Sequence, residues 1–179
     1  MTPDNEPRAP RVRLATTWLD GCSGCHMSFL DLDERLIDLA TRVDLVYSPL
    51  VDRKDFPESV DVTLIEGAVA SEADLEKIRL VRERTRVLVS LGDCAVTGNV
   101  PAMRNPFGLK ATLERGYGDA VPTDGVPRLL ERVLPVHQVV PVEVVVPGCP
   151  PPADTIFFVL SELLEGRVPD LAGRARFGA

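Results

Sequence analysis

The four cysteines of this 179-residue chain each follow a stretch typical of a β-strand. They are Cys22, Cys25, Cys94 and Cys149. The first two form a C-x-x-C motif after the stretch 12–19, the third follows 86–91, and the fourth follows 142–146. If these strands are parallel in one sheet, the four thiols meet at its carboxyl edge, where open α/β sheets bind ligands. The pattern therefore predicts a metal centre held by thiolates.

Segments typical of strands and of helices alternate along the chain. The expected strands are 12–19, 43–47, 60–69, 86–91 and 142–146. The expected helices are 27–42, 71–85 and 153–165, the second with Ser71 as its N-cap and Asp74 three residues on. Such alternation indicates a parallel sheet with helices on both faces. We therefore expect an α/β fold, a flavodoxin-like doubly wound parallel sheet with the cluster site at the carboxyl edge of the strands.

The length of the chain suits one domain with a well-buried core. We expect residues 1–11, which are polar and rich in proline, to be a flexible tail, and residues 12–179 to form a single flavodoxin-like iron–sulfur domain. The stretch 95–141 is rich in glycine and proline and is expected to be loop-rich. Long loops in compact domains are usually functional or covered by a partner, so this stretch predicts an interface.

Charge and hydropathy exclude several classes of partner. The net charge of −7 argues against nucleic acid or an anionic membrane as the main partner. No apolar run approaches the roughly 18 residues that span a bilayer, so no membrane span is expected. The first eleven residues have no apolar segment typical of a secretory signal. We therefore expect a cytoplasmic protein, in which cysteines remain reduced and are better suited to metal binding than to disulfides.

Several kinds of site use cysteines in such numbers. A zinc site usually pairs two short C-x-x-C hairpins, and a thioredoxin-type C-x-x-C couple leaves Cys94 and Cys149 without a role. Four unrelated buried cysteines are a further alternative. Iron–sulfur clusters are held by four thiolates, and glycines beside the cysteines, such as Gly24, Gly92 and Gly148, would let backbone N–H groups approach the sulfides. The spacing favours a cluster. Flavin is not expected, because no phosphate-binding loop follows the first strand.

Four sequence blocks carry a family resemblance. They are residues 18–31 around the C-x-x-C motif, Glu66-Gly67-Ala68-Val69, residues 92–100, and Pro147-Gly148-Cys149-Pro150-Pro151. Together they resemble the small subunit of [NiFe] hydrogenases, with most similarity to the cytoplasmic, bidirectional, NAD-reducing type, over residues 12–165. The resemblance implies one [4Fe-4S] cluster proximal to the nickel–iron site. Its ligands would be Cys22, Cys25, Cys94 and Cys149.

The resemblance also implies an electron-transfer role with no catalytic residue in this chain. The partners would be a large subunit that carries the nickel–iron site and a diaphorase with flavin and iron–sulfur clusters. The overall reaction would be H₂ plus NAD⁺ to NADH plus H⁺. No cysteine follows Cys149, so a single cluster is expected. Periplasmic members have an acidic residue where Met27 lies here, so a proton-relay role of that acid does not transfer.

Alternatives remain beside this interpretation. The chain would also suit another cytoplasmic hydrogenase, such as a cofactor-420-reducing type, or an energy-converting hydrogenase. A related quinone oxidoreductase subunit is disfavoured, because it typically has adjacent cysteines. From a different class, a zinc-stabilised interaction module would use the same four thiols. His26, beside Cys25, and Glu66, near the end of its strand, are candidates for contacts with the cluster or a partner.

Overall fold

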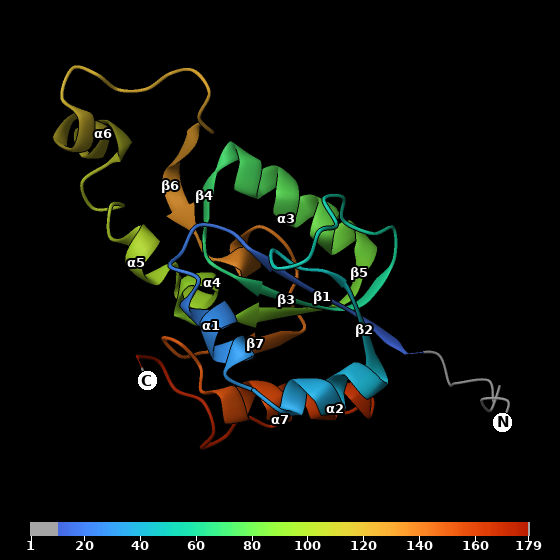
Figure 1. Ribbon diagram of the computed structural model, residues 1–179. Helices are drawn as coiled ribbons and strands as arrows, with labels where there is room; N and C mark the ends of the chain where they lie inside the picture. Colours follow the sequence, from blue (N-terminus) through green and yellow to red (C-terminus); the bar gives the residue numbers. More distant parts are fainter. Residues whose placement is uncertain (1–10, 179) are drawn as a thin grey trace, which may run out of the picture.

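The computed structural model describes residues 11–178 of the chain, so most of the expected N-terminal tail lies outside it. Within this range, five parallel strands form the central sheet. They are β1 (Val12–Trp18), β2 (Val43–Tyr47), β3 (Val60–Glu66), β5 (Thr85–Leu91) and β7 (Val144–Val146). Their order in space is β2-β1-β3-β5-β7, and every neighbouring pair is parallel (Figure 1). Numbered along the chain, this is the 2-1-3-4-5 order of flavodoxin-like folds. The predicted fold class is confirmed.

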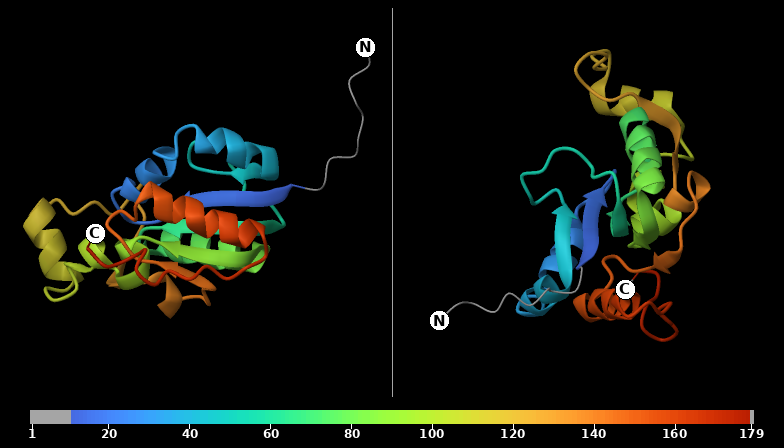
Figure 2. Two further views of the ribbon diagram at one scale, coloured as in Figure 1. Left: turned by 90° about the horizontal axis from the view of Figure 1, so that it is seen from below. Right: turned by 90° about the vertical axis from the view of Figure 1, so that its right-hand side faces the viewer.

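Helices cover both faces of this sheet. The first two helices after β1, α1 (Gly24–Leu30) and α2 (Arg35–Arg42), lie on the same face as α7 (Ala153–Leu164), and α3 (Glu72–Arg84) covers the other (Figures 1 and 2). Successive side chains of a strand point to opposite faces. Accordingly, Leu64 packs in the core cluster that includes Leu160 of α7, whereas Ile65 packs in the cluster that includes Ile78 of α3. The inner strands β1, β3 and β5 are largely buried on both faces, as their apolar sequences predict, whereas the edge strands β2 and β7 each expose part of one face.

Two expected elements are divided in the structure. The helix expected over 27–42 is two helices, because Asp33 adopts the left-handed conformation (φ 51°) in the turn between them. The strand expected over 60–69 ends at Glu66, because Gly67 has a φ of +83° and turns the chain into the short strand β4 (Val69–Ser71). The expected helix cap is confirmed: Oγ of Ser71 accepts the backbone N–H of Asp74 at 3.1 Å.

The stretch 95–141 is more ordered than its composition indicates. It contains α4 (Asp93–Thr97), α5 (Asn99–Ala102), α6 (Leu109–Tyr117), β6 (Leu129–Leu134) and the short 3-10 helix η1 (Val136–Gln138). Loops remain at 103–108 and 118–128, so the expectation of a loop-rich stretch is met in part. The strand β6 pairs with β4 in a small antiparallel sheet and so gives the proline-rich stretch a partner. Figure 1 shows α6 lying well away from the central sheet.

None of the helices between residues 11 and 178 has the length and apolar character needed to cross a membrane.

Candidate metal centre

The topology brings the four cysteines to one edge of the sheet. Cys22 and Cys25 lie in and after the loop that follows β1, Cys94 lies in α4 directly after β5, and Cys149 follows β7. All four are free thiols. Burial raises the pKa of the Cys25 thiol, and the charges of Glu66 and of the other three cysteines raise it further. The cysteines are therefore close enough to interact electrostatically, as their positions after parallel strands predict.

The loop that carries Cys22 is fixed against the end of β3 by the backbone. The backbone N–H of Asp20 donates to the carbonyl of Ala68 at 3.0 Å, and the backbone carbonyl of Asp20 accepts the N–H of Ala68 at 2.7 Å. A Cβ on Gly67 would lie 2.8 Å from the carbonyl oxygen of Asp20, so only glycine permits this approach. The chain then turns through Ser23, whose φ is 64°, into α1. The C-x-x-C motif therefore begins in a turn that backbone hydrogen bonds attach to the chain after β3, and it ends in the first turn of α1.

Glycine also makes room for the sulfur of Cys25. A Cβ built on Gly92, at the end of β5, would lie 2.2 Å from Sγ of Cys25. Gly92 has a φ of +83°, a conformation that other residues rarely adopt. In the Cys149 loop, a Cβ on Gly148 would lie 2.6 Å from Cα of Pro151. The sequence positions of these glycines therefore reflect close packing around the thiols.

Asp93 joins the Cys94 and Cys149 loops. Its side chain is buried, and its Oδ1 accepts the N–H of Gly148 at 2.7 Å. Its own N–H donates to the carbonyl of Gly148 at 2.8 Å, and its Oδ2 accepts the N–H of Gly178 at 2.7 Å. One side chain thus holds two of the cysteine-bearing loops in register. Its position between a buried strand and Cys94 is the sequence signal that could have identified it.

His26 and Glu66 form a buried pair beside Cys25. Oε2 of Glu66 accepts the backbone N–H of His26 at 2.6 Å and lies 2.8 Å from its ring Nδ1. The ring of Trp18 packs edge-on at a centroid distance of 5.2 Å. Within the described part of the chain, Nε2 of His26 is buried without a hydrogen-bond partner. The structure therefore brings both sequence candidates to the centre, where Glu66 orients the first turn of α1.

Among the described residues, two groups offer N–H donors near the cysteine sulfurs. Burial raises the pKa of the Cys94 thiol, and the nearby backbone N–H of Val100 acts in the opposite direction without outweighing burial. Nδ2 of Asn99 lies 3.5 Å from Sγ of Cys149. Sequence reasoning did not single out Asn99. The signal that could have found it was its position in the same short motif as Cys94, Gly92 to Val100.

The centre is covered on one side and open on the other. Cys25 and Cys94 are partly buried, whereas Cys22 and Cys149 are exposed. Large apolar side chains close in sequence to these ligand candidates are also exposed: Met27, Val100 and Met103 are 59%, 61% and 68% exposed. Because exposed apolar side chains that lie together are typical of partner surfaces, these three residues are candidates for such a contact.

The surroundings of the thiols suit an iron–sulfur cluster. Across residues 11–178, no group of three His, Cys, Asp or Glu side chains is spaced to hold a single metal ion. The glycine-lined space beside Cys25 and the N–H donors near Cys94 and Cys149 also suit the sulfides and thiolates of a cluster.

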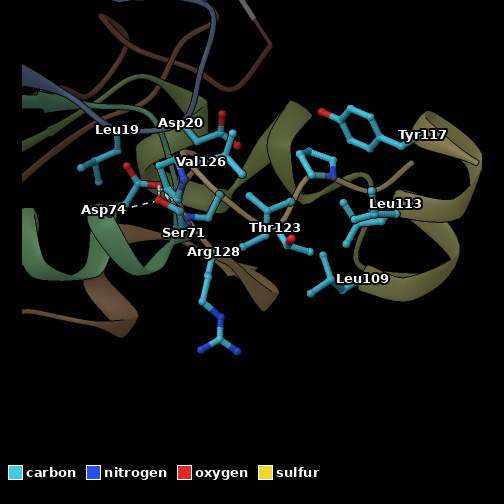
Figure 3. A pocket seen from close by; sticks show the side chains of 15 residues that line it. Leu19, Asp20, Ser71, Asp74, Leu109, Leu113, Tyr117, Thr123, Val126 and Arg128 are labelled. Atoms are coloured by element: carbon cyan, nitrogen blue, oxygen red, sulfur yellow. Dashed lines mark hydrogen bonds between the residues drawn. The ribbon is translucent and has the colours of Figure 1, made fainter. Parts of the chain in front are cut away.

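A cavity of about 660 Å³ lies beside this centre. Figure 3 shows Leu113 and Tyr117 of α6 on one side of it, and Asp20 and Asp74 on the other. Burial raises the pKa of Asp20, and the charge of Asp74 adds to this effect. Asp20 is two residues from Cys22, so the cavity borders the cysteine loop without containing a thiol.

Sequence comparison places residues 22–163 in the family described as NADH ubiquinone oxidoreductase, 20 kDa subunit. The chain is 43% identical over 175 residues to the delta subunit of the NAD-reducing hydrogenase HoxS of Cupriavidus necator, covering 92% of this chain and 84% of that protein. It is 41% identical over 172 residues to a subunit of the vhu F420-non-reducing hydrogenase of Methanococcus voltae, covering 91% of this chain but only 60% of that relative.

Solved structures agree with these relationships. A chain in the crystal structure of NAD⁺-reducing [NiFe]-hydrogenase in the H₂-reduced state matches with a TM-score of 0.90 and 40% identity, over 94% of this chain and 99% of that one. A chain of the [NiFeSe]-hydrogenase of Dm. baculatum matches with a TM-score of 0.61 and 19% identity, over 94% of this chain and 70% of that one. At this lower identity the second match supports the fold alone.

Proposed function

We infer the role of the protein from one premise: the chain belongs to the family of the 20 kDa subunit of NADH–ubiquinone oxidoreductase and, within it, to the small subunits of NAD-reducing [NiFe] hydrogenases. We propose that this chain holds one [4Fe-4S] cluster through Cys22, Cys25, Cys94 and Cys149. In this role it relays electrons between the nickel–iron site of a large subunit and a diaphorase. The chain is thus a component of an oxidoreductase complex and contributes no catalytic residue of its own.

One observation carries the cluster proposal. Four thiols from three strand ends interact at one edge of the sheet, next to a glycine whose missing Cβ leaves space for Sγ of Cys25. The irons of a cluster would supply the positive charge that favours thiolates and would offset the burial and the negative charges of Glu66 and the other cysteines, which otherwise raise the pKa of Cys25. When bound, the cluster supplies a one-electron carrier.

The residues of this chain bind and orient the proposed carrier. Asp93 fixes the Cys94 and Cys149 loops to each other, and Glu66 fixes the start of α1 through the backbone and ring of His26. The partly buried Cys25 and Cys94 lie on the side that the chain itself shields from water. The exposed Cys22 and Cys149 lie on the open side, where a partner brings its own redox centre close.

The exposed side of the proposed cluster site indicates where the partner proteins bind. We propose that the large subunit covers the exposed cysteines and the apolar side chains of Met27, Val100 and Met103. A diaphorase with flavin and iron–sulfur clusters would accept the electrons and reduce NAD⁺. We base the proposed partners on the NAD-reducing hydrogenase and not on the Methanococcus voltae hydrogenase, because this chain covers most of the length of the NAD-reducing relative and a smaller share of the other. The proposed compartment is the cytoplasm, where thiols remain reduced.

Metal analysis of the complex tests the cluster. The complex is purified without oxygen, and iron, acid-labile sulfide and zinc are measured. We expect about four irons and about four sulfides from this chain beyond those of its partners, and their loss when Cys25 or Cys94 is replaced by serine. One zinc per chain with no associated sulfide would instead support a zinc-stabilised interaction module.

Electron transfer is tested separately. The complex should reduce NAD⁺ with H₂, and the Cys94→Ser complex should lose this reaction. NADH oxidation by an artificial acceptor at the diaphorase should remain, because that reaction bypasses this chain. Equal loss of both reactions would contradict the relay role.

A further inference from the structure

We propose that Asn99 is a positioning residue that raises the reduction potential of the cluster through a hydrogen bond from Nδ2 to Sγ of Cys149. The inference rests on the proposed function, because it requires Cys149 to be a cluster ligand. Nδ2 lies 3.5 Å from Sγ, within the longer range typical of hydrogen bonds to sulfur. Within residues 11–178, Asn99 is the one side chain that makes such a bond to a cysteine sulfur.

The chemistry of the ligand fixes which end of the amide faces it. A thiolate bound to iron has lone pairs and no proton, so it accepts hydrogen bonds and donates none. A carboxamide has an NH₂ group that donates and an oxygen that only accepts. The NH₂ group of Asn99 is therefore the end that stabilises Cys149 when the thiolate is bound.

The backbone holds this amide in place. Asn99 has a φ of 31°, a positive value that asparagine tolerates better than most residues. Its N–H donates to Oγ1 of Thr97 at 3.3 Å, and that hydroxyl donates to the carbonyl of Asp93 at 2.8 Å. The N–H of Gly98 donates to the carbonyl of Cys94 at 2.9 Å. The turn that follows Cys94 thus directs Asn99 toward the cysteine of a different loop.

The effect on potential follows from charge. A hydrogen bond to a ligand sulfur stabilises the reduced cluster more than the oxidised one, because the reduced cluster places more negative charge on its sulfurs. Cys149 is exposed in this chain, so water competes for the same sulfur before a partner is bound. Once a partner excludes this water, the local dielectric constant falls, and the hydrogen bond from Asn99 becomes stronger and has a larger effect on the potential. The assembled complex is where the residue acts.

Three variants of the assembled complex test the role. Asn99→Gly removes the donor and tolerates the positive φ. Asn99→Asp keeps the size of the side chain but replaces the donor by a charged acceptor. Thr97→Val disturbs the same turn by removing its hydroxyl while leaving the Asn99 amide intact. The midpoint potential of the cluster is measured by redox titration followed by electron paramagnetic resonance, together with iron content.

We expect a lower midpoint potential in Asn99→Gly, a still lower one in Asn99→Asp, and a smaller decrease in Thr97→Val, which loosens the amide but keeps the donor, with wild-type iron content in all three. An unchanged potential in Asn99→Gly would overturn the inference, as would a Thr97→Val decrease that persists when residue 99 is already glycine. Either outcome leaves the cluster in place, so the proposed function stands. A wild-type complex without a cluster bound by this chain overturns both. Should Asn99→Gly fail to assemble, the Asn99→Asp potential decides the question.

Discussion

Oδ1 of Asp93 accepts the N–H of Gly148 at 2.7 Å, across the gap between the two strand ends that carry Cys94 and Cys149. The two residues are 55 positions apart in sequence, and their bond is buried. A second bond runs the opposite way, from the N–H of Asp93 to the carbonyl of Gly148 at 2.8 Å. The relative position of two proposed ligands therefore depends on one carboxylate as well as on the sheet.

Replacing Asp93 by asparagine should loosen the Cys149 loop. The two carboxylate oxygens of Asp93 accept the N–H groups of Gly148 and Gly178, but asparagine has a single acceptor oxygen. Its NH₂ group would therefore face one of these backbone N–H donors. Losing a buried hydrogen bond to a charged group costs roughly 1.5–3 kcal/mol. Hydrogen–deuterium exchange of the assembled complex should show faster exchange at Gly148. The exposed Asp119→Asn serves as control, and equal protection in Asp93→Asn and the wild type would contradict the prediction.

Replacing Gly92 by alanine should prevent cluster binding. The new Cβ would lie 2.2 Å from Sγ of Cys25, so the thiol must move. Gly108 offers a matched control, because its φ of +79° is similar and its Cβ would meet open space. Both variants carry the backbone strain of a positive φ, roughly 1–2 kcal/mol, but we expect only Gly92→Ala to lose iron. Similar iron loss in both would show that strain, and not the contact with Cys25, is responsible.

The two substitutions Glu66→Gln and Glu66→Ala should behave differently. A single oxygen of Glu66 accepts both hydrogen bonds from His26, and glutamine retains such an oxygen. Alanine leaves two buried donors without an acceptor, at a cost of roughly 1–3 kcal/mol for each. We expect near-normal iron content in Glu66→Gln and marked loss in Glu66→Ala. The prediction fails if the two variants retain the same amount of iron.

Glu143, which lies away from the proposed cluster site, should make the free energy of unfolding depend on pH. Partial burial raises the pKa of its carboxyl, but hydrogen bonds from the N–H of Leu88 and from Arg82 outweigh this effect and lower it. Because the folded pKa is lower than the unfolded one, the stabilisation is present above about pH 4.3 and is lost as the pH falls through the folded value.

The comparison with Glu143→Gln isolates this contribution. The wild type and Glu143→Gln are unfolded in urea between pH 3 and pH 7, and the difference between their urea midpoints is taken at each pH. Any effect of the cluster that is the same in both proteins cancels in this difference. We expect the wild type to be more stable at pH 7 and the difference to shrink as the pH falls. A difference that stays constant with pH would show that the carboxylate is not responsible.

Sequence patterns predicted the sheet because its inner strands are largely buried on both faces and so form apolar runs in the sequence. They could not predict that Asp33 divides the first helical region, because the apolar spacing from Phe29 to Leu39 continues across the break. The small β4–β6 sheet was also missed, because its pairing is antiparallel and joins residues about 60 positions apart.

At the centre itself, sequence identified the cysteines and pointed to His26 and Glu66. The structure brings the four cysteines to one edge, while their role as ligands stays a proposal. Asp93 and Asn99 were not identified, because their importance lies in contacts with Gly148 and Cys149, which are 55 and 50 positions away. Such contacts depend on how the loops pack after the sheet has formed, and the local sequence indicates only that the two residues lie in the same short motif as Cys94.

The uneven exposure of the four cysteines bears on the order of biogenesis. With Cys22 and Cys149 exposed, iron and sulfide could reach the proposed cluster site in the folded chain, while Cys25 and Cys94 already lie against its interior. Docking of the proposed large subunit on this side would close that route. In the proposed assembly, loading would therefore precede docking, and the centre would be most exposed to oxygen in the interval between the two steps.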